Sequence, residues 1–422
     1  MQNKMTNLPQ GWEVKKLEEI ANIKGGKRLP KGKNLLDNNT KFAYIRVADF
    51  QDNGTINLQN IKFINENTYN VLKNYKIYDD NLYISIAGTI GKSGIIPKEL
   101  NGAILTENAV KLEYIQNNIS NKFMYFFTLS NIFKTQIQTS TKIVAQPKLA
   151  ITRLKQIQIP LPPLKEQERI VGILDESFAK IDESIKILEQ DLLNLDELMQ
   201  SALQKAFNPL KDNAKENYKL PQGWEWKSLG EISNLIQNGF AASKNNEIPS
   251  GYVHLRTHNI STDGNLNFDT LIKIKREFIK EKQSFIEKND ILFNNTNSTE
   301  LVGKTALVTQ NYNYAFSNHL TKIKLKNQYN SKLVVFYFVL LLKNKYFEKI
   351  CHQWIGQSGI NIDKLKKIQI PLPPLKEQEQ IAKHLDFVFE KTKALKELYT
   401  KELKDYEELK QSLLNKAFKG EL

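Results

Sequence analysis

IQIPLPPLKEQE, at residues 157–168, occurs a second time without a single change at 368–379. The opening LPQGWE at 8–13 returns in the same way at 220–225, and the copies lie 211 or 212 residues apart. This period is about half of the chain and far exceeds the repeats of solenoids and propellers, so each repeated unit has the size of a domain. The sequence therefore predicts a tandem duplication, with a pseudo-two-fold relation between two similar halves.

A long helix is predicted behind each copy of this proline-rich segment. Apolar residues recur at steps of three and four from Ile170 to Ala206, which is the heptad pattern of a helix that pairs with another helix. The pattern returns from Ile381 to Ala417, where Thr392 and Glu402 interrupt it. Each helix of about 43 residues would be about 65 Å long, and we expect the two to form an antiparallel coiled coil. The predicted seam residues are Ile170, Leu174, Phe178, Ile181, Leu188, Leu195, Ile381, Leu385, Leu395 and Leu409.

Each half also contains a region of mixed strand and helix patterns, without a regular alternation of the two. A short amphipathic helix is expected at 14–20 and again at 226–232, and aromatic-rich helices at 121–132 and 331–342. Because the pattern has no βαβ rhythm, the predicted class is α+β, with two α/β domains separated by the paired helices. Strand-like runs lie at 42–47, 82–86, 110–114, 252–255, 291–293 and 320–325. The predicted divisions are a first domain at 1–163, a central helix at 164–207, a linker at 208–219, a second domain at 220–374 and a C-terminal helix at 375–422.

Net charge distinguishes the first helical segment from the rest of the chain. The 422 residues carry a formal net charge of +14, and 41% of them are hydrophobic, which is enough for real cores. Residues 165–207 nevertheless hold ten acidic and only five basic side chains, so the positive excess lies elsewhere. A lysine-rich coding bias also produces basic proteins, but this uneven distribution favours a polyanion as the ligand.

Several classes of protein are disfavoured by the composition. The single cysteine, Cys351, cannot form an intramolecular disulfide or a cysteine metal cluster. His254 and His258 are the only close pair of histidines, and we interpret both as polar surface residues rather than metal ligands. No apolar run approaches the roughly 20 residues that a bilayer span needs, and the first residues lack an apolar signal core. A cytoplasmic protein without membrane contact is therefore expected.

Two segments resemble the end of a phosphate-binding loop without completing it. AGTIGKS at 87–93 lacks the first glycine of such a loop, because Ile86 stands in its place. VGKT at 302–305 fails in the same way, with Ser298 at that position. We find neither an amino-methyltransferase tetrapeptide nor a carboxylate or histidine constellation suited to hydrolysis. The chain is therefore predicted to be non-catalytic and to hold no metal or cofactor.

The remaining chemistry is that of recognition. Lysine neutralises phosphate, arginine suits guanine edges, and side-chain amides suit adenine edges. Arg46 and Arg256 occupy matching places at strand ends, where each is either a base reader or a structural ion-pair residue. The repeated segments are identical in both halves of the chain, whereas the globular regions between them differ at most positions. The two halves of the target should therefore differ in sequence. The DNA-binding candidates are Lys24, Lys27, Arg28, Lys31, Arg46, Thr89, Lys92, Asn108, Arg256, His258, Asn294, Asn295, Asn297, Lys304 and His319.

These motifs together resemble the specificity subunit of type I restriction–modification systems over nearly the whole chain. The resemblance rests on the two LPQGW openings, on Gly91-Lys92 and Gly303-Lys304, and on the two proline-rich segments that precede long helices. It implies two target-recognition domains that each read one half of a bipartite site in double-stranded DNA, with the helices setting the spacing. It also implies two methyltransferase subunits and restriction–translocase subunits as partners, which would bind S-adenosylmethionine, ATP and Mg²⁺.

Other functions stay open on the sequence alone. The chain could be a single-chain restriction or methylation enzyme, which methyl transfer by the purified chain would reveal. It could serve a related system in which methyltransferase and nuclease are fused, or it could be a helical scaffold that does not bind DNA specifically.

Overall fold

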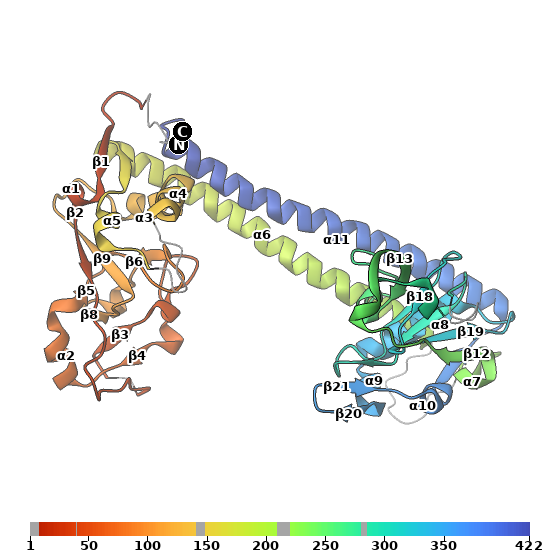
Figure 1. Cartoon of the computed structure of the whole chain (residues 1–422). Coiled ribbons are helices and arrows are strands. Elements are labelled where there is room, and N and C mark those ends of the chain that lie inside the picture. The colour runs from red at the N-terminus through yellow and green to blue at the C-terminus, as the bar shows by residue number, and fades with distance from the viewer. Residues whose placement is uncertain (1–7, 39, 141–147, 209–219, 280–284) are drawn as a thin grey trace. The chain divides into compact units, whose positions relative to one another are not determined.

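The computed structural model describes residues 8–38, 40–140, 148–208, 220–279 and 285–422. They form two compact units, one comprising residues up to Leu188 with Lys401–Leu422, the other comprising Glu189–Thr400. Each unit holds one mixed domain and a part of each long helix, α6 (Leu164–Phe207) and α11 (Leu375–Ala417) (Figure 1). The predicted α+β class and internal repeat are confirmed. Most of the predicted linker 208–219 lies outside the described residues, and the domain boundaries stay a prediction.

The main sheet has the same strand order in both units, although the sequences differ. In the first unit the order is β2-β9-β6-β7, and in the second it is β12-β19-β15-β17, with every neighbouring pair antiparallel. The first four strands are β2 (Ala21–Gly25), β9 (Ala109–Tyr114), β6 (Leu82–Ser85) and β7 (Ser93–Ile95). Their counterparts are β12 (Ser233–Asn238), β19 (Leu320–Leu325), β15 (Ile291–Asn294) and β17 (Thr305–Leu307).

A second sheet in each unit contains a parallel pair, β3–β8 or β13–β18. Its strands are β4 (Lys62–Phe63), β3 (Ala43–Ile45), β8 (Ala103–Leu105) and β5 (Lys76–Ile77), matched by β14 (Lys273–Ile274), β13 (Glu247–Leu255) and β18 (Ala315–Phe316). The helices of the first unit are α1 (Leu17–Ile20), α2 (Glu66–Leu72), α3 (Asn121–Leu129), α4 (Asn131–Ser140) and α5 (Ile151–Lys155). Those of the second are α7 (Leu229–Ile232), α8 (Ser331–Lys343), α9 (Tyr346–Ile350) and α10 (Ile362–Lys366).

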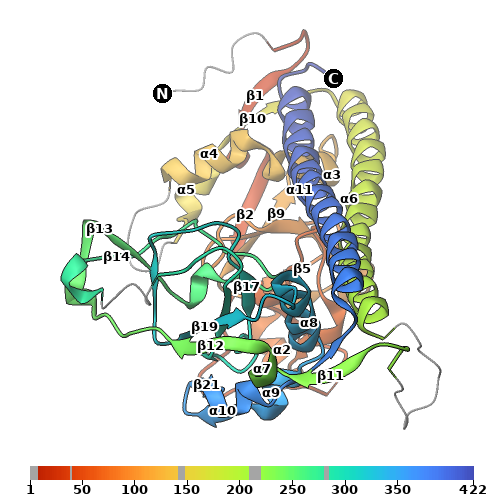
Figure 2. The same cartoon turned by 90° about the vertical axis from the view of Figure 1, so that its right-hand side faces the viewer.

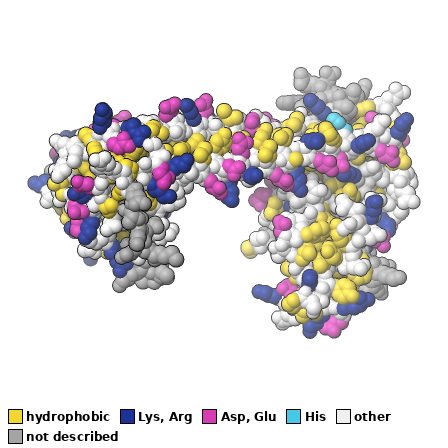
Figure 3. Space-filling view, turned by 90° about the horizontal axis from the view of Figure 1, so that it is seen from above, with side chains coloured by type: hydrophobic (Ala, Val, Ile, Leu, Met, Phe, Trp, Pro, Cys, Tyr) yellow, Lys and Arg dark blue, Asp and Glu magenta, His cyan; other side chains and the backbone are white. Residues whose placement is uncertain are grey.

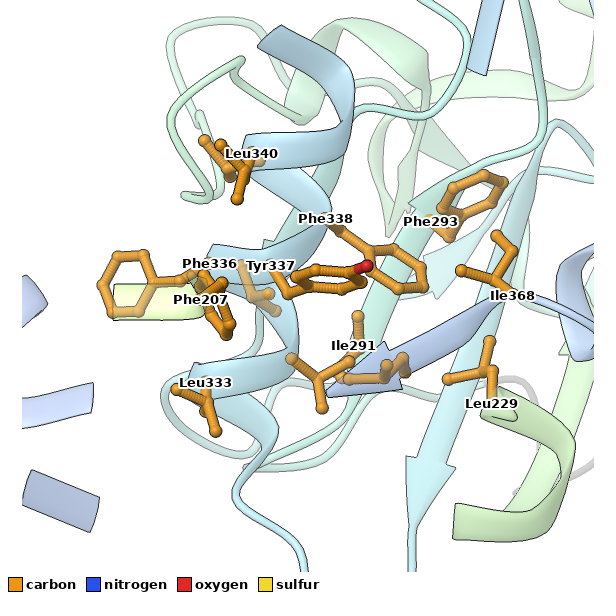
Figure 4. Packing of buried hydrophobic residues seen from close by; sticks show 14 of the residues in the cluster. Phe207, Leu229, Ile291, Phe293, Leu333, Phe336, Tyr337, Phe338, Leu340 and Ile368 are labelled. Atoms are coloured by element: carbon orange, nitrogen blue, oxygen red, sulfur yellow. The ribbon is translucent and has the colours of Figure 1, made fainter. Parts of the chain in front are cut away.

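Helix α8 is buried on all sides because it lies between the main sheet and the long helices. Its eight consecutive residues from Leu333 to Leu340 are all buried, and Phe338 packs edge-on against Phe293 of β15. On its other side, Tyr337 meets Phe207 at the end of α6, with ring centres 5.0 Å apart (Figure 4). Burial of each such side chain stabilises the folded state by about 1.5–3 kcal/mol. The end of α6 is thus part of the core of the second domain.

The first domain is completed in the same way by the end of the other helix. Phe418, which directly follows α11, is buried against Phe123 and Phe127 of α3, with ring centres 5.1 and 5.5 Å away. Ile170 and Leu174 at the start of α6 belong to the same apolar cluster. Each domain is therefore held by the beginning of its own long helix and by the end of the other one.

The proline-rich segments pair with the strands that follow the two LPQGW openings. Strand β10 (Gln158–Leu161) runs antiparallel to β1 (Glu13–Lys16), and β22 (Gln369–Leu372) runs antiparallel to β11 (Glu225–Ser228). Pro160 lies within β10, opposite Val14, because a two-stranded ribbon has free edges that tolerate proline. The amphipathic helices expected at 14–20 and 226–232 are too long, because only α1 and α7 are helical there.

A buried glutamine in each proline-rich repeat fastens the long helix to its domain. The Gln378 side chain accepts a hydrogen bond from the Asn330 amide at 2.9 Å and donates to the Pro373 carbonyl at 2.8 Å. Gln167 accepts from the Ser120 amide at 2.8 Å and donates to the Pro162 carbonyl at 2.9 Å. Asn330 caps α8 and Ser120 caps α3. The repeated motif therefore sets the direction in which each long helix leaves its domain.

The two long helices run antiparallel beside each other within each unit (Figure 1, Figure 2). In the first unit Arg169 donates a hydrogen bond to the Leu422 carbonyl, and Asp182 forms an ion pair with Lys410. Residues further along α6 therefore contact residues earlier in the C-terminal segment, as antiparallel helices require. In the second unit Asp196 of α6 pairs with Lys396, whose amine lies 2.6 Å from the carboxylate. The predicted coiled coil is confirmed.

Every seam residue predicted on α6 is buried or half-buried, whereas two of those predicted on α11 are not. Leu395 and Leu409 are exposed, while Thr392, which we expected to interrupt the seam, is buried and donates its hydroxyl to the Val388 carbonyl. A threonine that bonds back to the preceding turn needs no outside partner, so it can fill a seam position. Of the predicted seam residues, those buried on α6 are Ile170, Leu174, Ile181, Leu188 and Leu195, with Phe178 half-buried, and on α11 Leu385 is buried and Ile381 half-buried.

Candidate nucleic-acid interface

The first domain carries a basic segment directly after β2. Lys27, Arg28 and Lys31 are exposed, and the Arg28 Nε lies 2.7 Å from a carboxylate oxygen of Glu107. Lys24, on β2 itself, forms an ion pair with Glu113. Exposed pairs of this kind hold side chains weakly, because solvent screens them. The four cations therefore stay available to phosphate groups.

The Gly-Lys turn of the first domain forms a second polar group of residues. Thr89 is exposed and its carbonyl accepts a hydrogen bond from the Ser85 hydroxyl. The Lys92 amine lies 2.8 Å from a carboxylate oxygen of Asp52, which is itself almost fully exposed. Asn108 is half-buried, and its carbonyl accepts a hydrogen bond from the Ile86 amide. The structure thus places Thr89 and Lys92 on one turn between β6 and β7.

The matched arginines have different surroundings. The Arg46 guanidinium bonds both carboxylate oxygens of the buried Asp49, which raises the pKa of Arg46. In the second domain Asn259 replaces that carboxylate, and the Arg256 guanidinium instead reaches the Ala242 carbonyl at 3.2 Å. Arg256 also lies 3.5 Å from a carboxylate oxygen of Glu247, which is partly exposed. Both arginines therefore form ion pairs, but only Arg46 is paired with a fully buried carboxylate. Sequence comparison of the repeats could have found this difference at the position three residues after each arginine.

The asparagines of the second domain divide into buried and accessible ones. Asn294 is fully buried, and the Asn295 amide donates to the Thr321 hydroxyl at 2.9 Å and to the Asn318 carbonyl at 3.1 Å. Because these amides already have partners inside the domain or lie out of reach of solvent, we assign them a supporting role. Asn297, on the short strand β16 (Thr296–Asn297), is half-buried and stays a candidate for base contact.

The cationic candidates of the second domain are less exposed than those of the first. Lys304 is buried, its amine donates to the Thr257 carbonyl at 2.9 Å, and burial lowers its pKa. His258 is exposed, and its Nε2 lies 3.1 Å from the Thr270 carbonyl. His319 is half-buried, and its backbone carbonyl accepts a hydrogen bond from the backbone amide of Asn295. Lys304 therefore holds the turn after β16 against the 3₁₀ helix Thr257–Asn259.

His254 was expected on the surface together with His258, and the structure corrects this expectation. Its ring is completely buried on β13, with Nε2 3.1 Å from the Phe240 carbonyl and the ring of Phe240 4.9 Å away. Burial, aided by the charge of Arg256, lowers its pKa from 6.5 to about 4. His254 is therefore neutral in the folded domain at neutral pH.

Acidification is consequently expected to destabilise the second domain. The unfolded chain takes up a proton near pH 6.5 while folded His254 does not, so stability is complete above that pH and falls as the pH drops towards about 4. Between pH 7 and pH 4.5 we expect a loss of about 2 kcal/mol in the free energy of unfolding, measured by urea denaturation. His254→Gln should remove most of this pH dependence, and the exposed-site control His258→Gln should keep it. Equal pH dependence in both variants would assign the titration to another group.

Within the described residues, no group of three or more histidine, cysteine, aspartate or glutamate side chains is placed to hold a metal ion. Among the helices that the structure describes, none is long and apolar enough to span a bilayer.

The two mixed domains share the topology of their main sheet, and each packs against the paired long helices. Their polar surfaces differ. These features define a recognition protein built by duplication. Residues 9–192 and 221–405 both match the family model described as type I restriction modification DNA specificity domain. The chain belongs to this type I restriction–modification specificity family.

Several known proteins are similar over the whole chain. The type I restriction enzyme EcoBI specificity subunit of Escherichia coli is 24% identical, with 100% of this chain and 88% of that protein covered. The StySPI specificity subunit of Salmonella potsdam is 25% identical, with 98% and 90% covered. A chain from a solved structure on complex assembly and conformational transition of the type I R-M system has a TM-score of 0.78 at 20% identity, covering 99% and 100%. The HsdS subunit from Thermoanaerobacter tengcongensis has a TM-score of 0.60 at 20% identity, with 100% of both chains covered. These two likenesses support the fold.

Proposed function

We propose that this chain recognises a bipartite, asymmetric DNA sequence, with one half read by each domain, and that it holds methyltransferase and restriction subunits. The observation that supports this most is the contrast between the shared frame and the different surfaces. The sheets, the buried glutamines and the glycine-lysine turns recur in both domains, whereas Asp49 is replaced by Asn259 beside the matched arginine. One frame with two surfaces suits two different half-sites.

The net charge supports DNA as the ligand. The chain carries a formal net charge of +14, although residues 165–207 are acidic, so the globular regions are the basic part. Contacts between lysine or arginine and phosphate release condensed counterions, which supplies affinity without sequence preference. Specificity then comes from the side chains that reach base edges.

The long helices offer surfaces for partner subunits. Figure 3 shows hydrophobic side chains gathered along the surface of the two long helices. In the second unit, a groove of about 590 Å³ is lined by Leu198, Ala202, Ile381 and Val388, with mostly apolar walls. Such a groove fits an amphipathic helix. The exposed apolar side chains on the helices are Ile187, Leu193, Leu198, Leu375, Phe387, Leu395, Leu398 and Leu409.

Catalysis then belongs to those partners. S-adenosylmethionine, ATP and Mg²⁺ would be bound by methyltransferase and restriction–translocase subunits, and this chain would supply no catalytic group. A system in which methyltransferase and nuclease form one fused partner would use this chain in the same way.

An exchange of domains between the two frames tests the proposal. Residues 226–367 of the second domain are replaced by residues 14–156 of the first, so that both domains carry the same recognition surface. The repeated segments at 8–13, 157–168, 220–225 and 368–379 stay in place on either side of each domain. The internal repeat predicts a pseudo-two-fold relation between the two halves, so we expect the methylated motif to change from asymmetric to an inverted repeat of one half-site. Mapping of methylated bases in a host that carries the gene, and in the same host without it, gives the result.

The reciprocal exchange, with the second reader in both frames, is the matched control and should yield the inverted repeat of the other half-site. An unchanged motif in either exchange, with the assembly intact, would show that the domains do not read separate halves.

A further inference from the structure

A β-hairpin in the second domain presents apolar residues at its tip. Strands β20 (His352–Trp354) and β21 (Gln357–Gly359) pair antiparallel, with Trp354 opposite Gln357. The turn between them consists of Ile355 and Gly356, and Gly356 has a φ of +79°. Ile355 is completely exposed and Trp354 is more than half exposed. The hairpin thus ends in two adjacent apolar side chains in water.

The turn itself does not require these residues. Two-residue hairpin turns favour Gly, Asn and Asp, which accept a positive φ or bond to their own backbone. Gly356 meets this requirement, but Ile355 is β-branched and finds no packing partner in a fully exposed position. An isoleucine here contributes nothing to the turn and leaves an apolar side chain free for an outside contact.

The hairpin is held firmly by the domain below it. Strand β21 also pairs with β16, where Asn297 lies opposite Ser358, and the Ser358 hydroxyl lies 2.8 Å from that of Thr299. The Ile360 amide donates to the Asn295 carbonyl at 2.9 Å. The Trp354 ring lies over Gly359 so closely that an added Cβ there would be 2.8 Å from it. The tip is therefore presented in a preformed position, which lowers the entropy lost on binding.

The surroundings of the tip suit nucleic acid. Residues 348–367 hold four lysines against two acidic side chains, Glu348 and Asp363, so the segment has a net positive charge. His352, Gln353 and Gln357 on the hairpin are exposed, and amide groups of this kind bond adenine edges. The strand that supports the hairpin, β16, carries Asn297, a candidate for base contact. Apolar residues among cationic and amide groups are the composition of proteins that insert a wedge into the duplex.

We propose that this hairpin enters the DNA half-site read by the second domain, with Ile355 inserted as a wedge at a base step and Trp354 packed against the flanking nucleotide. The proposal rests on the proposed function. Insertion unstacks the step locally, and the cost of unstacking then depends on the sequence at that step. The hairpin would therefore add specificity at a position where no hydrogen bond is made. The corresponding segment of the first repeat, 141–147, lies outside the described residues.

Fluorescence of 2-aminopurine tests the wedge. The full chain, assembled with its methyltransferase subunits, is titrated into a duplex that carries the motif found by methylation mapping, with 2-aminopurine at successive adenine positions of each half-site. The adenine that a methyltransferase subunit flips out brightens in each half-site independently of the hairpin, so it serves as an internal reference. Apart from it, we expect a fluorescence increase at one step of a single half-site, because an unstacked 2-aminopurine is brighter. Ile355→Ala should abolish the increase and weaken binding to this duplex about tenfold or more, which corresponds to about 1.4 kcal/mol.

Two further variants keep the test decisive. Ile355→Leu preserves an apolar wedge and should retain the signal, and Ile115→Ala, which truncates an exposed isoleucine of the first domain, should change neither signal nor affinity. Unchanged affinity and fluorescence in Ile355→Ala would overturn the wedge alone. Loss of methyltransferase subunits from Ile355→Ala would also overturn it, because the tip would then be a protein contact. Absence of wild-type binding to the mapped duplex would overturn the proposed function itself.

Discussion

Gly239→Ala is expected to unfold the second domain, and Gly26→Ala the first. A Cβ at Gly239 would lie 2.0 Å from the carbonyl oxygen of Phe316, and one at Gly26 would lie 2.1 Å from that of Thr106. Both obstacles are backbone atoms, which cannot rotate away as a side chain can. The clash therefore requires the strands themselves to separate.

The position of these glycines explains why separation is costly. Gly26 follows β2 and donates to the Ala109 carbonyl at 3.0 Å, and Gly239 follows β12 and donates to the Leu320 carbonyl at 3.1 Å. Each lies where the chain leaves the main sheet and touches the end of the parallel strand pair of the second sheet. Movement there breaks contacts of both sheets, and we expect each substitution to lower the free energy of unfolding by more than about 3 kcal/mol.

Hydrogen exchange measured by mass spectrometry distinguishes the two variants. Gly239→Ala should remove protection from peptides of 225–374 and leave those of 13–161 protected, and Gly26→Ala should do the reverse. Gly172→Ala is the matched control, because nothing lies within 4 Å of a Cβ there and the position is in helix α6; it should stabilise by up to about 1 kcal/mol. Protection that stays intact in Gly239→Ala would show that the strands yield without cost.

The repeat made most of the architecture predictable from the sequence. The duplication is visible because two segments are identical, and hydrophobic periodicity locates the strands at 82–86, 110–114 and 320–325 and the two long helices. These elements have a clear period and sufficient length. Four-residue elements such as α1 and α7 escape prediction because a stretch this short does not display a period.

The polar sites were less predictable, because burial of a polar residue depends on the tertiary fold. Asn294, His254 and Lys304 are polar by type, yet each is buried and is surrounded by atoms from strands or turns distant in sequence. The seam of α11 was misplaced for a related reason. Lys396 and Lys410 take seam positions because Asp196 and Asp182 on α6 pair with them, and a pattern that counts only apolar residues passes over such lysines. Chain position alone also could not show that Ile355 lies at a hairpin tip.

Duplication of one heptad in each long helix is expected to lengthen the spacing between the two DNA half-sites without changing either half-site. The ion pairs Asp182–Lys410 and Asp196–Lys396 define which heptads face each other. Residues 182–188 of α6 lie opposite 404–410 of α11 in this register, so both segments are duplicated together. The duplicated segments then pair with each other in the same register, with their seam residues and their ion pair preserved.

The expected change follows from helix geometry. Seven residues add about 10 Å to a helix, which matches about three base pairs at 3.4 Å each. Three base pairs also turn the duplex by somewhat less than a third of a turn, whereas a heptad turns a straight helix by only about 20°. We therefore expect the longer protein to prefer a spacer about three base pairs longer, with lower affinity than the parent has for its own site.

Methylation mapping measures both the half-sites and the spacer in one experiment. Duplication of 182–188 in α6 alone is the control; it displaces one seam against the other and should abolish methylation of both the original and the lengthened motif. A lengthened protein that methylates the original spacer unchanged would show that the helices do not set the distance. If the half-sites themselves changed, the helices would be part of the reading surface, because nothing else in the protein was altered.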